Sequence, residues 1–508
     1  TDGGYTATCN VTVAGEDELI LSEKSLNIAK EEALTLTSNK DVTWTSDNIS
    51  IAKVSNAKTK TVTVTGIRAG NTKIIAKTSD GKEAECNLNV YYPVKSVAIN
   101  ETNEEVIVGS ITRLTEVLDP INATNQNVTW TSSNENVATV DETGKVTGIK
   151  TGTTTIQIKT EDGNYTATCT INVVAKPVTT SDTFLTYKET DGEISVTGYT
   201  GSETKVVLPE TINGKPVVAL GNGGKLTGFD NVTSVILSDS ITTIGSYAFN
   251  ENTSLVSIDF KNVKVIGSDA FRAATSLKKI SLPDTLQKLG SNSFMDCSGL
   301  DCDIIIPDSV TTMEMGSNFA NCTKIRRVTL SKNCSMVGAC AFDGSSLSGI
   351  LKIPEGVERL EAGCFSETNY TNVEFADSVK YIEYAAFRPA SKLMEGEIIL
   401  PPNLILLGDG IFDHARYATN KSITIPKTVK WIGGDAVKIT LENWGKDNNT
   451  YYSTHTFYDV ASYTLEEFIV EDGSTTFKAV DGVLYSKDGT RMVAFPSSKK
   501  VDNGTFIM

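Results

Sequence analysis

Histidines and cysteines are the residues of this chain best suited to act as bases, nucleophiles or metal ligands. The 508 residues include two histidines, His414 and His455, and nine cysteines. No two cysteines have the Cys-x-x-Cys spacing of zinc or redox sites. No glycine-rich phosphate loop, dinucleotide fingerprint or nucleophile elbow stands between a strand and a helix. The sequence therefore predicts no enzyme, no metal site and no cofactor.

The charge balance limits the partners of the chain. Lys and Arg number 46 against 62 Asp and Glu, a net charge of −16. An acidic chain without a basic stripe is a poor ligand for nucleic acid or for an anionic membrane surface. No stretch approaches the roughly 18–20 apolar residues that cross a bilayer. We expect no nucleic-acid partner and no membrane insertion.

The first part of the chain repeats itself. The run Trp-Thr-Ser at 44–46 recurs at 130–132, and the run at 66–70 recurs at 148–152. Short alternating runs rich in Thr and Val lie between these marks, bounded by Gly and Asn or Asp. Such spacing is typical of an antiparallel β-sandwich, with Trp44 and Trp130 buried between its sheets.

These recurring segments also resemble those of a known domain family. The pattern WTSxNxxVATVxxxGxVTGxxxGxxxI, ending in DGxxATCxxxV, resembles the group 2 bacterial immunoglobulin-like (Big) domains over residues 1–175. The resemblance implies a module remnant at 1–15, modules at 16–92 and 93–175, and a linker at 176–183. Because residues 1–9 repeat the end of a module, we expect the chain to be part of a longer protein. Its export signal and anchor would then lie outside this chain.

A second repeat fills the rest of the chain. Short apolar strands are expected at 279–282, 303–306, 397–400 and 422–425, and each is followed by proline. A Val-x-x-Ile-Gly turn and an Ala-Phe step complete the repeat unit. A unit of this length cannot bury an apolar face alone, so the units must stack as coils of a solenoid. The phenylalanines that mark the coils are Phe249, Phe271, Phe294, Phe319, Phe342, Phe365, Phe387 and Phe412.

The second repeat, LxxIxLPxxVxxIGxxAFxxC, resembles the BspA-type leucine-rich repeats over residues 184–508. Residues 477–486 resemble the late hairpin of that family. The expected fold class is mostly β, with tandem Ig-like β-sandwiches followed by a BspA-type leucine-rich-repeat solenoid.

The cysteines are expected to be free thiols. Cys9, Cys86 and Cys169 occupy the same place in successive modules, one in each, whereas an immunoglobulin disulfide needs two per sandwich. Most solenoid cysteines flank the repeat phenylalanines, where a small apolar side chain packs well. Cys302 and Cys334 are less regular, and a disulfide to a neighbour stays open for them.

Alternation along the solenoid strands predicts which side chains face outward. Arg327, Lys352 and Glu374 are expected on this outer face, which is mixed in character and suits weak protein binding. The residues expected to face the core are Ile258, Phe260, Ile280, Leu282, Val328, Leu330, Val373 and Phe375.

One break in the period is a second candidate for binding. The repeat glycine Gly433 precedes its matching Phe457 by 457 − 433 = 24 positions, where other coils have four. The insertion near 434–456 is rich in aromatic residues, and Trp444, Tyr451 and Tyr452 are the leading ligand-binding candidates. Such rings could stack on a sugar or a protein partner. Alternatively, they pack on the adjacent coil and brace the solenoid.

Both resemblances imply a bacterial cell-surface adhesion or interaction protein outside the cell. The Ig-like modules would act as spacers, and the solenoid would bind an unknown protein or glycan of a host or the environment. Two alternatives stay open. The chain could be a non-catalytic binding or scaffold region of a larger extracellular enzyme, or a structural stalk without a specific ligand.

Overall fold

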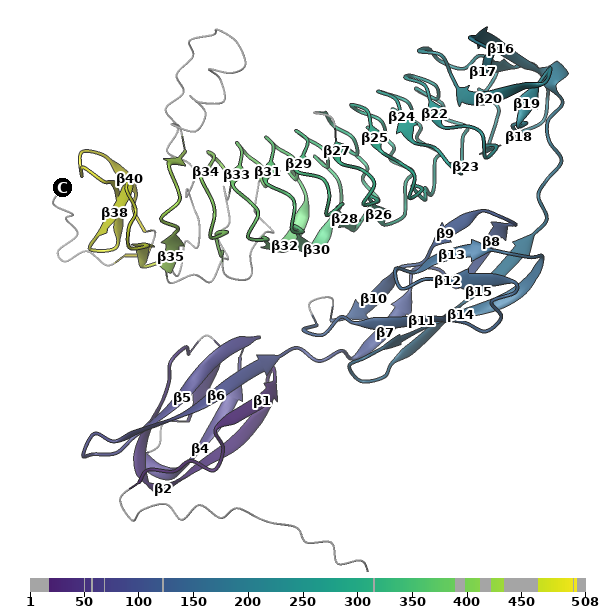
Figure 1. The fold of residues 1–508 in the computed structure, drawn as a ribbon. Coiled ribbons are helices and arrows are strands. Elements are labelled where there is room, and N and C mark those ends of the chain that lie inside the picture. Colours follow the sequence, from purple (N-terminus) through teal and green to yellow (C-terminus); the bar gives the residue numbers. More distant parts are fainter. Residues whose placement is uncertain are drawn as a thin grey trace, which may run out of the picture. The chain divides into compact units, whose positions relative to one another are not determined.

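The computed structural model describes residues 18–49, 51–55, 58–67, 69–120, 123–313, 316–388, 398–411, 422–433, 465–496 and 498–499. These residues form strands and turns with one short 3-10 helix, Asp182–Phe184, and the described part contains no α-helix. The prediction of a mostly β chain is confirmed (Figure 1). Two compact units are present. The first comprises Thr1–Glu104, Leu114–Gly144 and Thr153–Asn172, and the second comprises Glu105–Arg113, Lys145–Gly152 and Val173–Met508.

The first Ig-like module is a six-stranded sheet in the order β1-β6-β5-β2-β4-β3. Its long strand β2 (Ala33–Ser46) pairs antiparallel with both β4 and β5, and its register with β4 shifts between Thr37 and Val42. At this shift the sequence is shorter than in the second module. The other strands are β1 (Ser25–Ala29), β3 (Ala52–Val54), β4 (Lys58–Gly66), β5 (Gly70–Lys77) and β6 (Glu83–Tyr91).

The second Ig-like module contains strands β7 to β15. Antiparallel pairing joins β7 to β10 and β11 to β14 in the first unit, and β9 to β13 in the second. The strands are β7 (Ser96–Ile99), β8 (Asn103–Ile107), β9 (Ile111–Arg113), β10 (Glu116–Asp119), β11 (Val128–Ser132), β12 (Ala138–Val140), β13 (Lys145–Gly148), β14 (Gly152–Thr160) and β15 (Thr166–Val174).

The tryptophans of both modules are buried, as predicted. Trp44 is 5% exposed and Trp130 is 7% exposed. The indole Nε1 of Trp44 donates to the carbonyl of Thr59 over 2.9 Å, so the polar edge of the ring is satisfied inside the module. Cys86 and Cys169, the equivalent cysteines, are fully buried thiols.

The solenoid carries two strand ladders, both parallel from coil to coil (Figure 1). The first ladder runs β20-β22-β24-β25-β27 and continues as β29-β31-β33-β34-β36. Its strands are β20 (Lys215–Leu220), β22 (Thr243–Ile244), β24 (Val265–Ile266), β25 (Lys288–Leu289), β27 (Thr312–Met313), β29 (Met336–Val337), β31 (Arg359–Leu360), β33 (Tyr381–Ile382), β34 (Leu406–Leu407) and β36 (Trp431–Ile432).

The second ladder holds the strands that the sequence predicted before each proline. It is broken into the groups β18-β21-β23, β26-β28, β30-β32 and β35-β37. Its strands are β18 (Lys205–Val207), β21 (Ser234–Ile236), β23 (Ser257–Asp259), β26 (Ile304–Ile305), β28 (Val328–Thr329), β30 (Ser348–Lys352), β32 (Asn369–Glu374), β35 (Ser422–Ile425) and β37 (Glu467–Val470).

Two details of the expected coil differ from the structure. The Val-x-x-Ile-Gly segment is expected as a turn, yet its last residues before the glycine form the first ladder, with Ile244 in register with Ile266. Equivalent turns in stacked coils present their backbone N–H and C=O groups at matching positions, so the groups pair between coils. The strand expected at 279–282 is reduced to one bridge, between Ser257 and Lys279, and the described residues 398–400 of the strand expected at 397–400 form no strand.

In the described coils from Phe249 to Phe387, the core of the solenoid is a stack of phenylalanine rings, one for each coil. Phe271 lies 5.0 Å from Phe294 between ring centroids, with the planes 1° apart, and Phe294 lies 5.2 Å from Phe319. Equivalent stacking links Phe249 to Phe271 and continues to Phe387. Phe412 lies outside the described residues. Of the eight residues expected to face the core, six are buried, and Val328 and Phe375 are half buried.

Hairpins flank the stacked coils in the sequence. The antiparallel pair β16 (Leu185–Thr190) and β17 (Glu193–Tyr199) begins this region, and β17 then pairs parallel with β20. The short strand β19 (Thr211–Ile212) also pairs with β20. At the other end, β38 (Phe477–Val480) and β39 (Val483–Ser486) form the expected late hairpin, joined by β40 (Met492–Ala494).

Candidate interaction surface

The outward side chains of the second ladder form the first candidate surface. We call the row that contains Thr329, Lys352, Glu374, Ile399 and Thr424 the outer row, and all five are exposed. Their alternate neighbours Leu330, Leu351 and Val373 are buried, because successive side chains of a strand point to opposite faces. The outer row therefore contributes little to the core.

Two of the three charged residues predicted for this surface lie next to each other. Lys352 ends β30, Glu374 ends β32, and the two are partners in the parallel register. Neighbouring strands lie about 4.8 Å apart, so this pair presents both signs of charge on adjacent coils. Opposite charges so close together give a partner a defined orientation.

Arg327 does not join this pair. It precedes β28, and its Nε lies 3.4 Å from Oδ2 of Asp303, on the preceding coil. The side chains are 30% and 16% exposed, so the carboxylate largely balances the guanidinium within the solenoid. Its charge is less available to a partner than that of a lone surface arginine.

The second candidate surface lies outside the described residues. This applies to the insertion at 434–456 with Trp444, Tyr451 and Tyr452, and to both histidines, His414 and His455. The outer row includes Ile399 before the insertion and Ile469 after it, and these two side chains are 71% and 42% exposed. Ile469 is in register with Thr424 on β35.

A charged cluster on the first ladder was missed by the sequence reasoning. Glu361 and Glu383 occupy the position that is glycine in other coils, where close coil contact favours a residue without a Cβ. A Cβ on Gly267, for example, would meet the backbone nitrogen of Ser246 at 2.4 Å. The glycine column is also interrupted at Met315, but only Glu361 and Glu383 place charged residues in it, and this was the available sequence signal.

Arg359 holds this cluster together. Its guanidinium forms an ion pair with Glu383, whose side chain is 4% exposed, and its Nε lies 3.9 Å from Oε1 of Glu361. The guanidinium carbon also lies 4.1 Å from the ring centroid of Tyr381, its neighbour in register. Burial, followed by the negative charge of Glu383, raises the pKa of Glu361. The cluster is thus compact and internally neutralised in part.

The cysteines offer little nucleophilic chemistry. The eight described cysteines are free thiols, including Cys302 and Cys334. Burial raises the pKa of Cys297 to about 12 and that of Cys302 to about 11, so both stay protonated at neutral pH. Among the described residues there is no group of three or more His, Cys, Asp or Glu side chains that could hold a metal ion.

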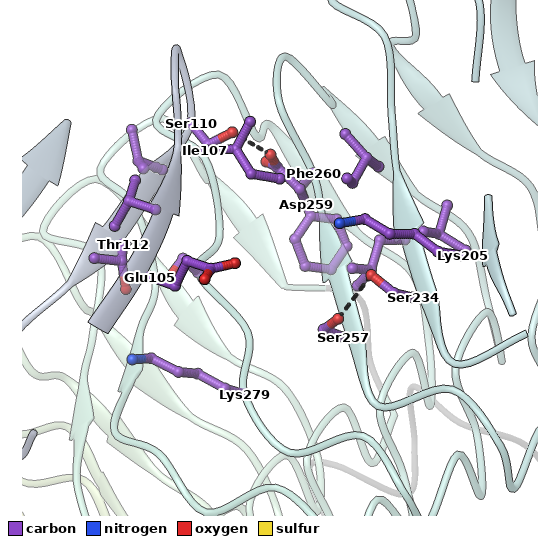
Figure 2. A pocket seen from close by; sticks show the side chains of 16 residues that line it. Glu105, Ile107, Ser110, Thr112, Lys205, Ser234, Ser257, Asp259, Phe260 and Lys279 are labelled. Atoms are coloured by element: carbon purple, nitrogen blue, oxygen red, sulfur yellow. Dashed lines mark hydrogen bonds between the residues drawn. The ribbon is translucent and has the colours of Figure 1, made fainter. Parts of the chain in front are cut away.

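A cleft within the second unit is a third feature, which the sequence reasoning did not predict. Figure 2 shows this space, which has a volume of about 260 Å³. Its floor is the start of the second ladder, where Lys205, Ser234 and Ser257 are in register on β18, β21 and β23. Residues 105–107 and 110–112 line the opposite side.

No helix in the described ranges is long and apolar enough to span a membrane.

Two family profiles match the chain. Residues 226–348, 316–442 and 358–479 match the BspA type leucine rich repeat region, and residues 8–87 and 93–171 match the bacterial Ig-like domain, group 2. The leucine-rich-repeat matches together span 226–479, which is 254 of 508 residues, or half of the chain.

Individual relatives share only parts of the sequence. An uncharacterized protein of Clostridium acetobutylicum is 27% identical over 167 residues, which is 32% of this chain and 17% of the relative. An alpha-L-arabinofuranosidase of Bifidobacterium longum is 47% identical over 62 residues, which is 12% of this chain and 6% of the enzyme. The chain thus spans less than a fifth of either relative's length.

Among solved structures, the T. pallidum leucine rich repeat protein is 25% identical with a TM-score of 0.30. The similarity covers 41% of this chain and 85% of that protein. A score this low says nothing about the partners of this chain. The profiles that match are those of non-catalytic domains.

Proposed function

This chain belongs to the BspA-type leucine-rich-repeat proteins and carries group 2 bacterial Ig-like domains, and we propose that it is an adhesion or interaction protein displayed outside a bacterial cell. Both domain types are typical of bacterial surface proteins. In this proposal the modules at 16–92 and 93–175 are spacers. The solenoid at 184–508 is the binding region for a protein or glycan.

The outer row is the observation that supports this proposal. A solenoid needs its inward side chains for stability, but the outward ones only for solubility. Here the outer row places Lys352 beside Glu374 and adds exposed Ile399 and Ile469 farther along. A mixed row of charged and apolar groups is suited to a protein surface, where electrostatic complementarity orients the partner and apolar contacts hold it.

An array of glycans and matrix proteins, probed with the whole chain, tests the proposal. Ligands found in this way should bind the double variant Lys352→Ala/Glu374→Ala at least about tenfold more weakly, because a partner whose charges complement this pair loses both contacts in the variant. The matched control is Glu358→Ala/Lys380→Ala. It removes an exposed pair, 2.8 Å apart, from the other ladder. Equal loss in both variants would exclude the outer row as the contact surface.

Arg327→Ala serves a different purpose. Because Arg327 balances Asp303, its loss should lower stability as well as any ligand affinity. A variant with unchanged melting temperature and weaker ligand binding would assign Arg327 to the contact surface directly.

We also propose the insertion at 434–456 as a contact region, with Trp444, Tyr451 and Tyr452 as its main residues. Joining Gly433 to Phe457 through a normal four-residue step should leave the melting temperature nearly unchanged, because closing a shorter turn is entropically easier. The same deletion should abolish binding to the ligand found on the array. If the C-terminal coils melt instead, the rings brace the solenoid.

The short match to an arabinofuranosidase keeps a second function open, that of a binding region in a larger extracellular enzyme. The sequence on either side of this chain distinguishes the two. A cell-wall sorting signal or S-layer module favours the adhesion protein, and a hydrolase domain favours the enzyme. An array without any specific ligand would instead favour a structural stalk.

A further inference from the structure

We propose that the cleft in the second unit binds a small zwitterion, such as an amino acid or a short peptide with free termini. This site is separate from the outer row at Lys352 and Glu374 and from the insertion. The proposal rests on the charges that face the cleft and on the contacts that hold its two sides together.

Two unpaired charges of opposite sign face each other across the cleft. Glu105 comes from β8 and Lys205 from β18, and Figure 2 shows their charged ends pointing into the space between them. Within the described part of the chain, no hydrogen bond or ion pair involves either side chain. A simple anion would be repelled by Glu105, and a simple cation by Lys205. A ligand with one charge of each sign satisfies both residues.

Hydroxyl groups also line the cleft. Ser257 Oγ donates to Ser234 Oγ over 3.1 Å on the floor, and Ser281 and Thr112 also line the cleft. They supply hydrogen bonds for the peptide or carboxylate groups of a ligand. The aromatic residue in the lining, Phe260, is 2% exposed and offers no ring face for a sugar.

The two sides of the cleft are held together by a network that involves three residues. Ser110 donates to the carboxylate of Asp259 and accepts from Lys261, and Lys261 Nζ lies 3.0 Å from Oδ2 of Asp259. The Lys261 side chain is only 6% exposed. Asp259 is neutralised here, and Lys279, the other charged residue of the lining, already has an interaction of its own, so Glu105 and Lys205 are the charges left for a ligand.

A second contact, made by Asp284, fixes β9, the strand that carries Ile111 and Thr112 of the cleft lining. Asp284 accepts from Arg113 and from Lys145, with each N···O distance 2.6 Å. The Arg113 side chain is 10% exposed and that of Asp284 is 54% exposed, so the bridge is shielded from solvent on the Arg113 side. A rigid cleft pays less entropy when a ligand binds than two mobile surfaces would.

Binding of the dipeptide Ala-Ala to the whole chain tests the proposal. Saturation-transfer NMR and calorimetry should detect it, and N-acetyl-Ala-Ala and Ala-Ala-amide, which each lack one charge, should bind about tenfold more weakly. Glu105→Gln should remove the preference for Ala-Ala over its acetylated form. Lys205→Met should remove the preference for Ala-Ala over its amide. High salt should weaken binding of Ala-Ala to the unaltered chain.

The controls separate the cleft from general surface charge. Lys264→Met removes an exposed lysine outside the lining and should leave Ala-Ala binding unchanged. Glu105 and Lys205 are exposed, so their variants should keep the melting temperature of the parent. The proposal is overturned if Ala-Ala shows no binding up to its solubility limit. It is equally overturned if capped and free dipeptides bind alike, or if both cleft variants bind as the parent does.

Discussion

Replacing Phe294 with alanine should open the middle of the solenoid. Phe294 is fully buried and stacks on Phe271 at 5.0 Å and on Phe319 at 5.2 Å, with Phe260 edge-on at 6.4 Å. A buried Phe→Ala change costs about 3–5 kcal/mol, including the cavity. We expect the upper half of this range, because strand pairing between the coils prevents Phe271 and Phe319 from closing the gap.

Hydrogen–deuterium exchange in Phe294→Ala measures this effect locally. Stability in a solenoid is close to a sum of coil and interface terms, so the loss should be largest in the coils of β25 and β27 and fade towards β34. Phe294→Leu is the matched control and should cost less than about 1.5 kcal/mol. A change below about 1 kcal/mol in Phe294→Ala would refute a core built on the ring stack, as would uniform loss of protection in every coil and both modules.

Three further predictions concern the thiols, the second module and the Glu361 cluster. Titration of the denatured chain without reductant should find close to nine free thiols, and five or fewer would contradict free cysteines. The native chain should react slowly with the thiol reagent, because burial raises the pKa of Cys297 to about 12. Trp130→Ala should cost about 3–5 kcal/mol and unfold its module while the solenoid survives; one joint transition in calorimetry would argue against independent modules. Glu361→Gln should raise the free energy of unfolding at neutral pH, because the raised pKa of Glu361 means that the folded state favours the neutral acid. This gain should vanish below about pH 4, where Glu361 is protonated in the unfolded chain as well. A pH-independent difference between variant and parent in chemical denaturation would show that burial of the charge is not the cause.

Periodicity was sufficient to predict the parts of the fold that repeat. The spacing of Phe249 to Phe387 predicted one ring per coil, and the structure stacks these rings in the core. The same holds for Trp44 and Trp130 in their modules. Each of these residues recurs because every repeat must fill the same core position, so the same residue type returns at a fixed interval in the sequence.

Features without a repeat were beyond sequence reasoning. The strands of the first ladder are mostly two residues long, too short to show the alternation that identifies a strand, so Thr243–Ile244 was expected as a turn. The partnership of Arg327 with Asp303 depends on side-chain reach between coils. Tertiary packing brings Glu105 and Lys205 into the lining of one cleft, about which neither local sequence says anything.

The central claim is that the solenoid binds a ligand outside the cell through its outer row. Adhesion of intact producing cells to the array-identified ligand, measured in competition with the soluble chain, tests this most directly. The account predicts that the soluble chain blocks adhesion and that Lys352→Ala/Glu374→Ala needs at least about tenfold higher concentration to do so. Adhesion that the soluble chain leaves unchanged, or that both proteins block equally, would contradict it.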